Sequence, residues 1–315
     1  MPASQVPPRW LHRFAVVTAA ATLGLIAAGA LVTSTGSGLA VPDWPLSFGQ
    51  VFPPMQGGVL FEHGHRLVAA FVGLLTVALA LAMQRWEPRP WVRRLAWGAV
   101  LAVLVQGLLG GLTVLLRLPT AVSVAHACLA QAFLCLVVSL AVCTAPSWQA
   151  PQARWQEAGG PSLRLVAVLT TVLVYVQLLL GALVRHLGAG LAIPDFPLAF
   201  GRLVPPLTSP GVTVHFLHRV GALLVASGVV WTVVRMRETG RGERWLQRPA
   251  LGLLALLLAQ LGLGALIVWT RRAVLPTTAH VVTGAALLAT SLVLTLRLYR
   301  LRPARAVALP ERVTA

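Results

Sequence analysis

The sequence predicts an all-α integral membrane protein with eight transmembrane helices, and three features carry this prediction. The 315-residue chain is 57% hydrophobic and only 10% charged, with a mean hydropathy of +0.80, whereas soluble domains carry about a quarter charged residues. Eight apolar runs are each long enough to cross a bilayer, which takes roughly 20 residues. An internal repeat divides these runs into two tandem four-helix bundles, expected to be related by a pseudo-two-fold axis along the membrane normal.

The expected helices follow from the apolar runs and divide the chain into two units. Residues 1–144 form an N-terminal four-helix unit, 145–162 a polar linker and 163–315 a C-terminal four-helix unit. The expected helices span residues 14–35, 63–84, 95–116, 121–144, 163–185, 213–235, 249–270 and 277–299.

The net charge of +17 does not indicate a nucleic-acid-binding protein, because the charge sits between alternate apolar runs. All 25 basic residues are arginines; eighteen lie at the termini and in three alternate connections, five lie in the other connections, and Arg66 and Arg219 stand at expected helix starts. This is the positive-inside pattern, which places a multi-pass protein in the cell membrane with both termini cytoplasmic. Membrane lipid is therefore an expected partner, and nucleic acid is not.

The repeat is clearest in the segments that follow the first and fifth runs. Residues 29–54 read GALVTSTGSGLAVPDWPLSFGQVFPP, and residues 181–206 read GALVRHLGAGLAIPDFPLAFGRLVPP, with 16 of 26 positions identical. Asp43 and Asp195 lie in the PDWP and PDFP turns, where a carboxylate is expected to cap backbone amides; the alternative is a role at the mouth of a cofactor site. The three cysteines all lie within the fourth run, where packing is the expected role.

Histidines inside apolar helices are the strongest functional signal, because ionisable groups in a membrane are expensive and mark functional sites. Four of the eight histidines stand at repeat-equivalent positions near the starts of even-numbered helices: His65 and His126 in the first copy, His218 and His280 in the second. These helices run in the same direction, so the four imidazoles are expected at one depth, toward the outer leaflet.

Helix 2 with helix 4, and helix 6 with helix 8, would bring these residues together as the pairs His65–His126 and His218–His280. Histidines on facing helices hold haem iron in helix bundles, and imidazole is a standard axial ligand. The alternative is four histidines satisfied by hydrogen bonds between helices. Two symmetric pairs at matched depth favour haem, and the second copy lacks further ligands for a tetrahedral metal site.

Small residues near the histidines would let a flat ring approach a helix backbone. They lie in GLLGGL (107–112) and GLGALI (262–267). Ordinary close helix packing is an equally good explanation.

The two copies differ one turn before the first histidine of each pair, where the first has Glu62 and the second has His215. Each shares a helical face with the histidine three residues later. A carboxyl group there suits proton transfer or stabilisation of a developing cation, so the first copy should carry chemistry and the second a redox cofactor. The alternative for Glu62 is a helix-start carboxylate favoured by the macrodipole.

Arg66 and Arg219 directly follow these histidines in the two copies. Each is expected to pair with a haem propionate, because arginine binds carboxylates through two hydrogen bonds. The alternative is snorkelling toward the lipid headgroups. His215 and Arg219 are expected to lie next to the His218–His280 pair and to support it without binding the iron themselves.

Taken together, these motifs resemble the haem A synthase family of bacteria and mitochondria, over roughly residues 14–299. The resemblance rests on GALVTSTGSGLAVPDWPLSFG, on the Glu62-x-x-His65-Arg66 element, and on His126, His218-Arg219 and His280. It implies an oxidoreductase of cytochrome oxidase assembly that converts haem O to haem A. A methyl substituent would be oxidised to a formyl group by successive O2-dependent hydroxylations.

The resemblance also implies a division of labour between the copies. His218 and His280 would bind the iron of a haem b cofactor. His65 and His126 would bind the iron of the substrate haem O, with Glu62 catalytic. A haem O synthase would be the upstream partner, and the electron donor is not specified.

One departure from the family concerns cysteines. Many bacterial members carry a cysteine pair in the segment between the first two helices, and residues 34–61 here contain none. A mechanism that needs a thiol there cannot operate. The alternative functions are a dihaem cytochrome that transfers electrons without making a product, and a repeat-built transporter that binds no haem.

Overall fold

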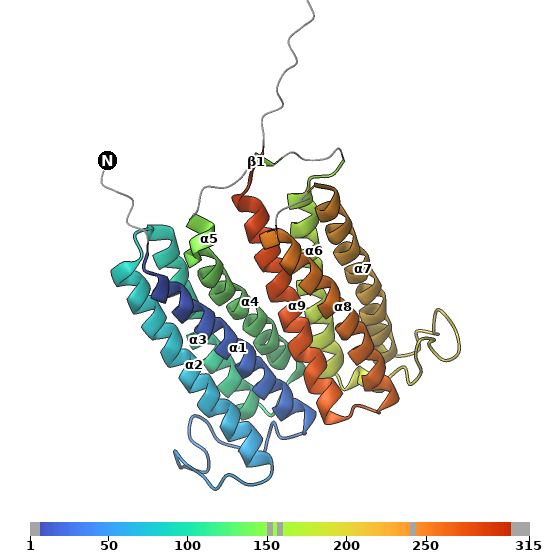
Figure 1. The fold of residues 1–315 in the computed structure, drawn as a ribbon. Coiled ribbons are helices and arrows are strands. Elements are labelled where there is room, and N and C mark those ends of the chain that lie inside the picture. Colours follow the sequence, from blue (N-terminus) through green and yellow to red (C-terminus); the bar gives the residue numbers. More distant parts are fainter. Residues whose placement is uncertain (1–6, 150–153, 156–159, 240–243, 304–315) are drawn as a thin grey trace, which may run out of the picture.

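Long helices aligned along one direction make up the molecule (Figure 1). The computed structural model describes residues 7–149, 154–155, 160–239 and 244–303. Its long helices are α1 (Arg9–Ser34), α2 (Gly58–Trp86), α3 (Pro90–Leu115), α4 (Thr120–Thr144), α6 (Leu163–His186), α7 (Pro210–Thr239), α8 (Arg244–Trp269) and α9 (Val274–Arg300). The short elements are α5 (Pro146–Gln149), η1 (Ala189–Leu191), β1 (Arg154–Trp155) and β2 (Arg302–Pro303), and the two strands pair in parallel.

The prediction of eight membrane-spanning helices is confirmed, since all eight long helices are long and apolar enough to cross a bilayer. Most begin earlier than the sequence suggested, and four of these carry a proline in or near the first turn. One is α7, whose first residue is Pro210. Pro90 is the first residue of α3 and Pro276 lies in the first turn of α9, where the missing N–H would have no helical partner. Pro249 lies just beyond the first turn of α8. The linker, predicted only as a polar join, also holds α5 and β1.

Each four-helix set is a closed ring of contacts between neighbouring helices. In the first set, α1 and α3 each contact both α2 and α4; in the second, α6 and α8 each contact both α7 and α9. Across the two sets, α4 contacts α9 and α6, and α1 contacts α9. This set of contacts maps onto itself when the repeat partners are exchanged. The pseudo-two-fold axis itself stays a prediction.

Helices α4 and α9 form the centre of the molecule. The share of residues buried within the most apolar stretch differs among the long helices. This share is 56% in α4 and 44% in α9, against 22–33% in the other long helices. The first hydrophobic core contains Phe133 and Leu134 of α4 together with Ala285 of α9, and the second contains Leu287 and Leu288 of α9. The two units are therefore packed through α4 and α9, while the outer faces of the other helices remain apolar and exposed, as lipid contact requires.

The two ends of the molecule differ in character. The start of α1 and the end of α9 lie at one end, which we call the terminal end (Figure 1). The opposite end carries two long connections, which we call the first loop (residues 35–57) and the second loop (residues 187–209). We call this the loop end.

Candidate haem site

The four repeat-equivalent histidines lie in one layer near the loop end. They are the seventh to ninth residues of α2, α4, α7 and α9, all of which begin at that end. At about 1.5 Å of rise per residue, each lies about 10–12 Å along its helix. The matched depth that the repeat predicted is therefore present.

The His218 and His280 rings face each other, with centroids 6.4 Å apart and planes at 67°. Metal–imidazole bonds are about 2 Å long, so two rings on opposite sides of one iron have centroids about 6 Å apart. Each ring would bind through a nitrogen in its own plane, so either ring could rotate about the metal–nitrogen bond. The angle between the two ring planes is therefore not restricted. The centroid separation of this pair is compatible with two imidazoles that would hold the iron of one haem.

His65 and His126 are likewise electrostatic neighbours in the first unit. Nδ1 of each is buried without a hydrogen-bond partner, and so is Nδ1 of His280. Unsatisfied buried ring nitrogens are costly in an apolar interior. Their presence fits imidazoles that bind a further group, because imidazole ligates metals through a ring nitrogen.

A glycine on the preceding helix lies against each of the four rings. A methyl group at any of these glycines would come within 3.0–3.5 Å of the Cε1 atom of the histidine. The pairs are Gly29–His65, Gly110–His126, Gly181–His218 and Gly264–His280. The close approach that small residues near the sites suggested is therefore to the imidazoles themselves, and it leaves each ring little room to turn toward the preceding helix.

Two glutamines at equivalent positions of the repeat also contact the layer. Nε2 of Gln106 lies 3.4 Å from Nε2 of His126, and Nε2 of Gln260 lies 3.2 Å from Nε2 of His280. A third glutamine, Gln177 of α6, contacts Nδ1 of His218 at 3.0 Å. From the sequence, the first two stood out only as matching positions of the repeat.

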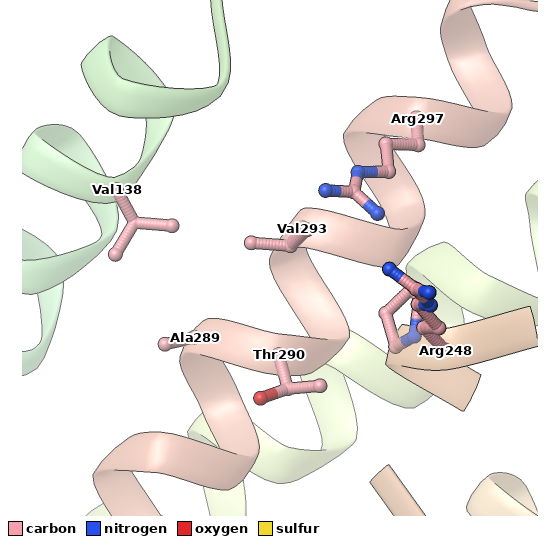
Figure 2. A pocket seen from close by; sticks show the side chains of 7 residues that line it. Val138, Arg248, Ala289, Thr290, Val293 and Arg297 are labelled. Carbon is pink, nitrogen blue, oxygen red and sulfur yellow. The ribbon is translucent and has the colours of Figure 1, made fainter. Parts of the chain in front are cut away.

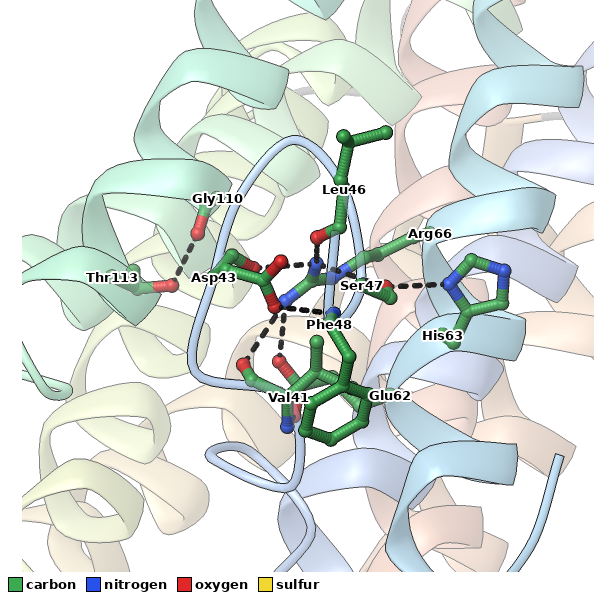
Figure 3. A network of polar contacts seen from close by, with 10 residues as sticks. All are labelled: Val41, Asp43, Leu46, Ser47, Phe48, Glu62, His63, Arg66, Gly110 and Thr113. Carbon is green, nitrogen blue, oxygen red and sulfur yellow. Dashed lines mark hydrogen bonds and ion pairs between the residues drawn. The ribbon is translucent and has the colours of Figure 1, made fainter. Parts of the chain in front are cut away.

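Glu62 and Arg66 hold the first loop onto α2 (Figure 3). Glu62 is 4% exposed; its Oε2 accepts the N–H of Val41 at 2.9 Å and its Oε1 accepts from Arg66 at 2.8 Å. The guanidinium of Arg66 also donates to the carbonyl oxygens of Asp43 and Leu46, both at 2.8 Å. Arg66 thus has a structural task in the loop, and its pairing with a propionate stays a prediction.

The second unit repeats this arrangement with one substitution. Arg219 donates to the carbonyl oxygens of Ile193, Asp195 and Leu198 in the second loop. The N–H of Ile193 donates to Nδ1 of His215 at 3.3 Å, as that of Val41 does to Glu62. Glu62 and His215 therefore share the task of accepting a loop amide, and only Glu62 adds an ion pair.

The two aspartates cap the tight turns of their loops, which confirms the turn prediction. Asp43 accepts the N–H groups of Phe48 and Gly49 at 2.7 and 2.8 Å. Asp195 accepts those of Phe200 and Gly201 at the same two distances. In each turn the hydrogen bonds from the glycine N–H and the phenylalanine N–H hold the pKa of the carboxyl below its ordinary value of 3.8, and the glycine has the larger effect.

Three polar residues near the layer were missed by the sequence analysis. His63 is 6% exposed, and its Nδ1 lies 2.8 Å from the hydroxyl of Ser47 in the first loop. Arg185 donates to Ala30 and Ser34 of α1, which ties α6 to the other unit. His186 follows the expected helix 163–185; in the structure it is the last residue of α6 and an electrostatic neighbour of His126. Contacts between distant segments define these roles, and no local pattern signals them.

A cleft of about 490 Å³ lies elsewhere, between α4, α8 and α9 (Figure 2). Its wall includes Val138 of α4 and Thr290 of α9, which lie twelve and ten residues beyond the histidines of the same helices. That separation is about 15–18 Å along each helix. This cleft is therefore on the terminal-end side of the molecule and is separate from the histidine layer.

The donor set fits haem rather than a bare ion. Within the described ranges, no group of three or more His, Cys, Asp or Glu side chains is arranged to hold a metal ion. The ligand-type residues of the layer come as two histidine pairs among Leu, Val, Ala and Gly. Imidazoles in apolar surroundings would suit the iron of a haem, which would supply redox chemistry there.

Replacing Arg66 with alanine should loosen the first loop without unfolding the bundle. Hydrogen bonds to a charged group are worth about 1.5–3 kcal/mol each, so amide exchange across residues 41–49 should accelerate about tenfold or more. Hydrogen–deuterium exchange measures this directly. Arg202→Ala is the control, because that arginine is exposed and its side chain has no hydrogen bond among the described residues. Unchanged exchange in Arg66→Ala would contradict the anchoring role.

The aspartate turns should also loosen in acid. A lowered folded-state pKa contributes stability that is complete above the unfolded value of 3.8 and is lost as pH falls through the folded value. Exchange in both loops, corrected for its intrinsic pH dependence, should therefore rise only below about pH 4. The acid step should vanish from the first loop in Asp43→Asn and persist in the second; a step that survives in both loops would rule out this cause.

Comparison with known proteins agrees with the geometry. Residues 12–59 and 55–292 match the family model described as "Cytochrome oxidase assembly protein". The chain is 38% identical over 249 residues to "Heme A synthase" of Symbiobacterium thermophilum, covering 76% of this chain and 79% of the relative. It is 33% identical over 276 residues to "Heme A synthase" of Shouchella clausii, covering 84% and 89%. This chain therefore belongs to the haem A synthase family of cytochrome oxidase assembly proteins.

Proposed function

We propose that this protein converts haem O to haem A by oxidising one methyl substituent of the porphyrin to a formyl group. The observation that carries the proposal is the His218–His280 ring pair together with the electrostatic neighbours His65 and His126 at the same depth, with a glycine of the preceding helix against each of the four rings. Two hydroxylations at the same carbon give a geminal diol, and loss of water leaves the aldehyde. Each hydroxylation consumes one O2, two electrons and two protons, and releases one water.

The two units divide the work. His218 and His280 hold a haem b, which supplies one-electron redox chemistry when bound. His65 and His126 hold the iron of the substrate haem, so that its reacting methyl group lies in the first unit. The difference that supports this order is Glu62, whose place in the second unit is taken by His215.

Glu62 is the proposed catalytic residue. It is buried, one helical turn from His65, and both of its oxygens are fixed by Val41 and Arg66. A carboxylate fixed in this way can hold a proton at Oε1 or Oε2 and stabilise positive charge that develops on a neighbouring carbon. Arg66 and Arg219 lie beside the ligand histidines, where they can meet the propionates of each haem.

The protein lies in the cell membrane with both termini in the cytoplasm. The terminal end carries most of the arginines, which supports this orientation. The histidine layer then faces the outer leaflet. A haem O synthase in the same membrane would supply the substrate, and a separate donor must supply electrons.

A dihaem cytochrome that makes no product is the second candidate. It is favoured by one observation: Glu62 already has structural partners in the first loop. The variant Glu62→Gln distinguishes the oxidising enzyme from the dihaem cytochrome. It keeps a hydrogen-bond acceptor for the N–H of Val41 and removes the charge of the carboxylate. Two intact haem spectra with full turnover in this variant would remove Glu62 from the mechanism, and a wild type that leaves haem O unchanged would favour the cytochrome.

The direct test is expression of the wild type with haem O, followed by mass analysis of the extracted porphyrins. Haem A should appear in the wild type. His218→Ala or His280→Ala should lose the tightly held haem b, whereas His65→Ala or His126→Ala should abolish conversion and retain it. Loss of the resident haem from the first-unit variants instead would reverse the division of labour.

Gly110 should be intolerant of side chains because it lies against His126. Gly110→Val should push the imidazole from its position and reduce haem occupancy of the first unit about tenfold or more, a loss comparable to that of a misplaced ligand. Gly107→Val is the matched control, since it lies on the same helix and a methyl group added there would meet nothing within 4 Å. Soret absorbance per protein measures both, and equal losses would show that helix packing alone is responsible.

A further inference from the structure

The two histidine pairs differ in how their first members are held. Gln106 and Gln260 stand at equivalent positions, and the Nε2 atom of each lies near Nε2 of the second member of its pair. Gln106 also donates to the backbone oxygen of His126 at 3.0 Å, so the larger difference between the pairs is at the first members. His218 is held by an additional residue: Nε2 of Gln177 lies 3.0 Å from its Nδ1 and donates to its backbone oxygen at 2.8 Å. Nε2 of His218 has no hydrogen-bond partner among the described residues, so this nitrogen is free to bind iron.

His65, the equivalent of His218, has no such support. Its ring makes no hydrogen bond within the described ranges, and its Nδ1 is buried without a partner. The repeat places Leu25 where the second unit has Gln177, and the two residues stand four positions before the glycines that touch the histidine rings. The first unit therefore has an apolar side chain where the second has a carboxamide.

A second substitution accompanies the first. Gly221 lies on the helix that faces Gln177, and a methyl group there would lie 2.1 Å from Oε1 of the glutamine. The repeat places Val68 at this position in the first unit, where Val68 and Leu25 both pack against the first hydrophobic core. Gln177 fits only beside glycine, so the two positions differ as a coupled pair.

A hydrogen bond to the second nitrogen of a ligating imidazole fixes the ring and raises its basicity. Losing such a partner typically costs about 10- to 100-fold in metal affinity. The carboxamide can serve either tautomer, because it offers both a donor and an acceptor. Oε1 of Gln177 is buried without a partner, so rotation about the terminal bond can present it to an Nδ1–H group.

We propose that Gln177, whose side chain fits because residue 221 is glycine, is a positioning residue that makes the second unit retain its haem. In the first unit, Leu25 and Val68 leave His65 unsupported, so that this unit exchanges its haem. This inference rests on the proposed function, because a substrate site must release product while a cofactor site must not. It explains why two copies with the same ligands can hold haem with different lifetimes.

The test exchanges the two pairs between the units and measures haem release. Full-length protein is loaded with haem b in one of two backgrounds: H65A/H126A, which leaves the second site, and H218A/H280A, which leaves the first. Release to excess apomyoglobin is followed in the Soret band. The second site should release haem at least about tenfold more slowly than the first.

The exchanged pairs should reverse this order. Q177L/G221V should accelerate release from the second site by about 10- to 100-fold, and L25Q/V68G should slow release from the first site by a similar factor. Slower release cannot arise from damaged folding, so the second arm remains decisive if the first variant is unstable. Unchanged release rates in L25Q/V68G would overturn the proposal.

A matched control separates positioning from helix packing. The hydroxyl of Thr170 joins α6 to α7 through Gly228 and Thr232, two turns from Gln177 and away from His218. T170V should leave both the release rate and the midpoint potential of the second haem unchanged, whereas Q177L/G221V should shift both. Equal effects from the two variants would show that Gln177 is only a helix contact. Absence of any Soret band in either background would instead remove the proposed function.

Discussion

Burying four imidazoles at one level of an apolar helix assembly is the constraint on which the rest of the structure depends. Lipid offers these rings no hydrogen-bond partners, and polar groups left unsatisfied there are costly. The protein meets part of the cost by supplying glutamines from neighbouring helices. Each of the four histidines still has at least one ring nitrogen without a hydrogen bond among the described residues, which leaves it able to bind iron.

The loop end shows how duplication kept a scaffold while one site diverged. Each loop is tied to its helix by an arginine that reaches three or more backbone carbonyls, and each tight turn is capped by an aspartate. The two units differ at two places in this shared arrangement. The first unit has Glu62 where the second has His215, and it has Leu25 and Val68 where the second has Gln177 and Gly221. Glu62 and His215 lie one turn before the first histidine of each pair, and Gln177 contacts His218 from the preceding helix. We propose that these differences alter the chemistry and the haem lifetime of the two units while the fold is kept.

Much of this architecture was predictable from periodicity and repetition. Long apolar runs define helices wherever they occur, and the repeat offset identified His65 as the equivalent of His218 without any structure. Several helix starts were misjudged because prolines in and near the first turn do not end a helix. The contacts of Glu62 and Arg66 with the first loop, and of Gln177 with His218, could not be predicted, because they depend on side chains that meet across separate segments.

The most direct test of the central claim is a density map of the full-length protein purified with haem b. The account predicts a macrocycle between α7 and α9, with its iron bonded to ring nitrogens of both His218 and His280. A map with the two rings in direct contact and no macrocycle between them, or with the macrocycle bound at another surface, would contradict it.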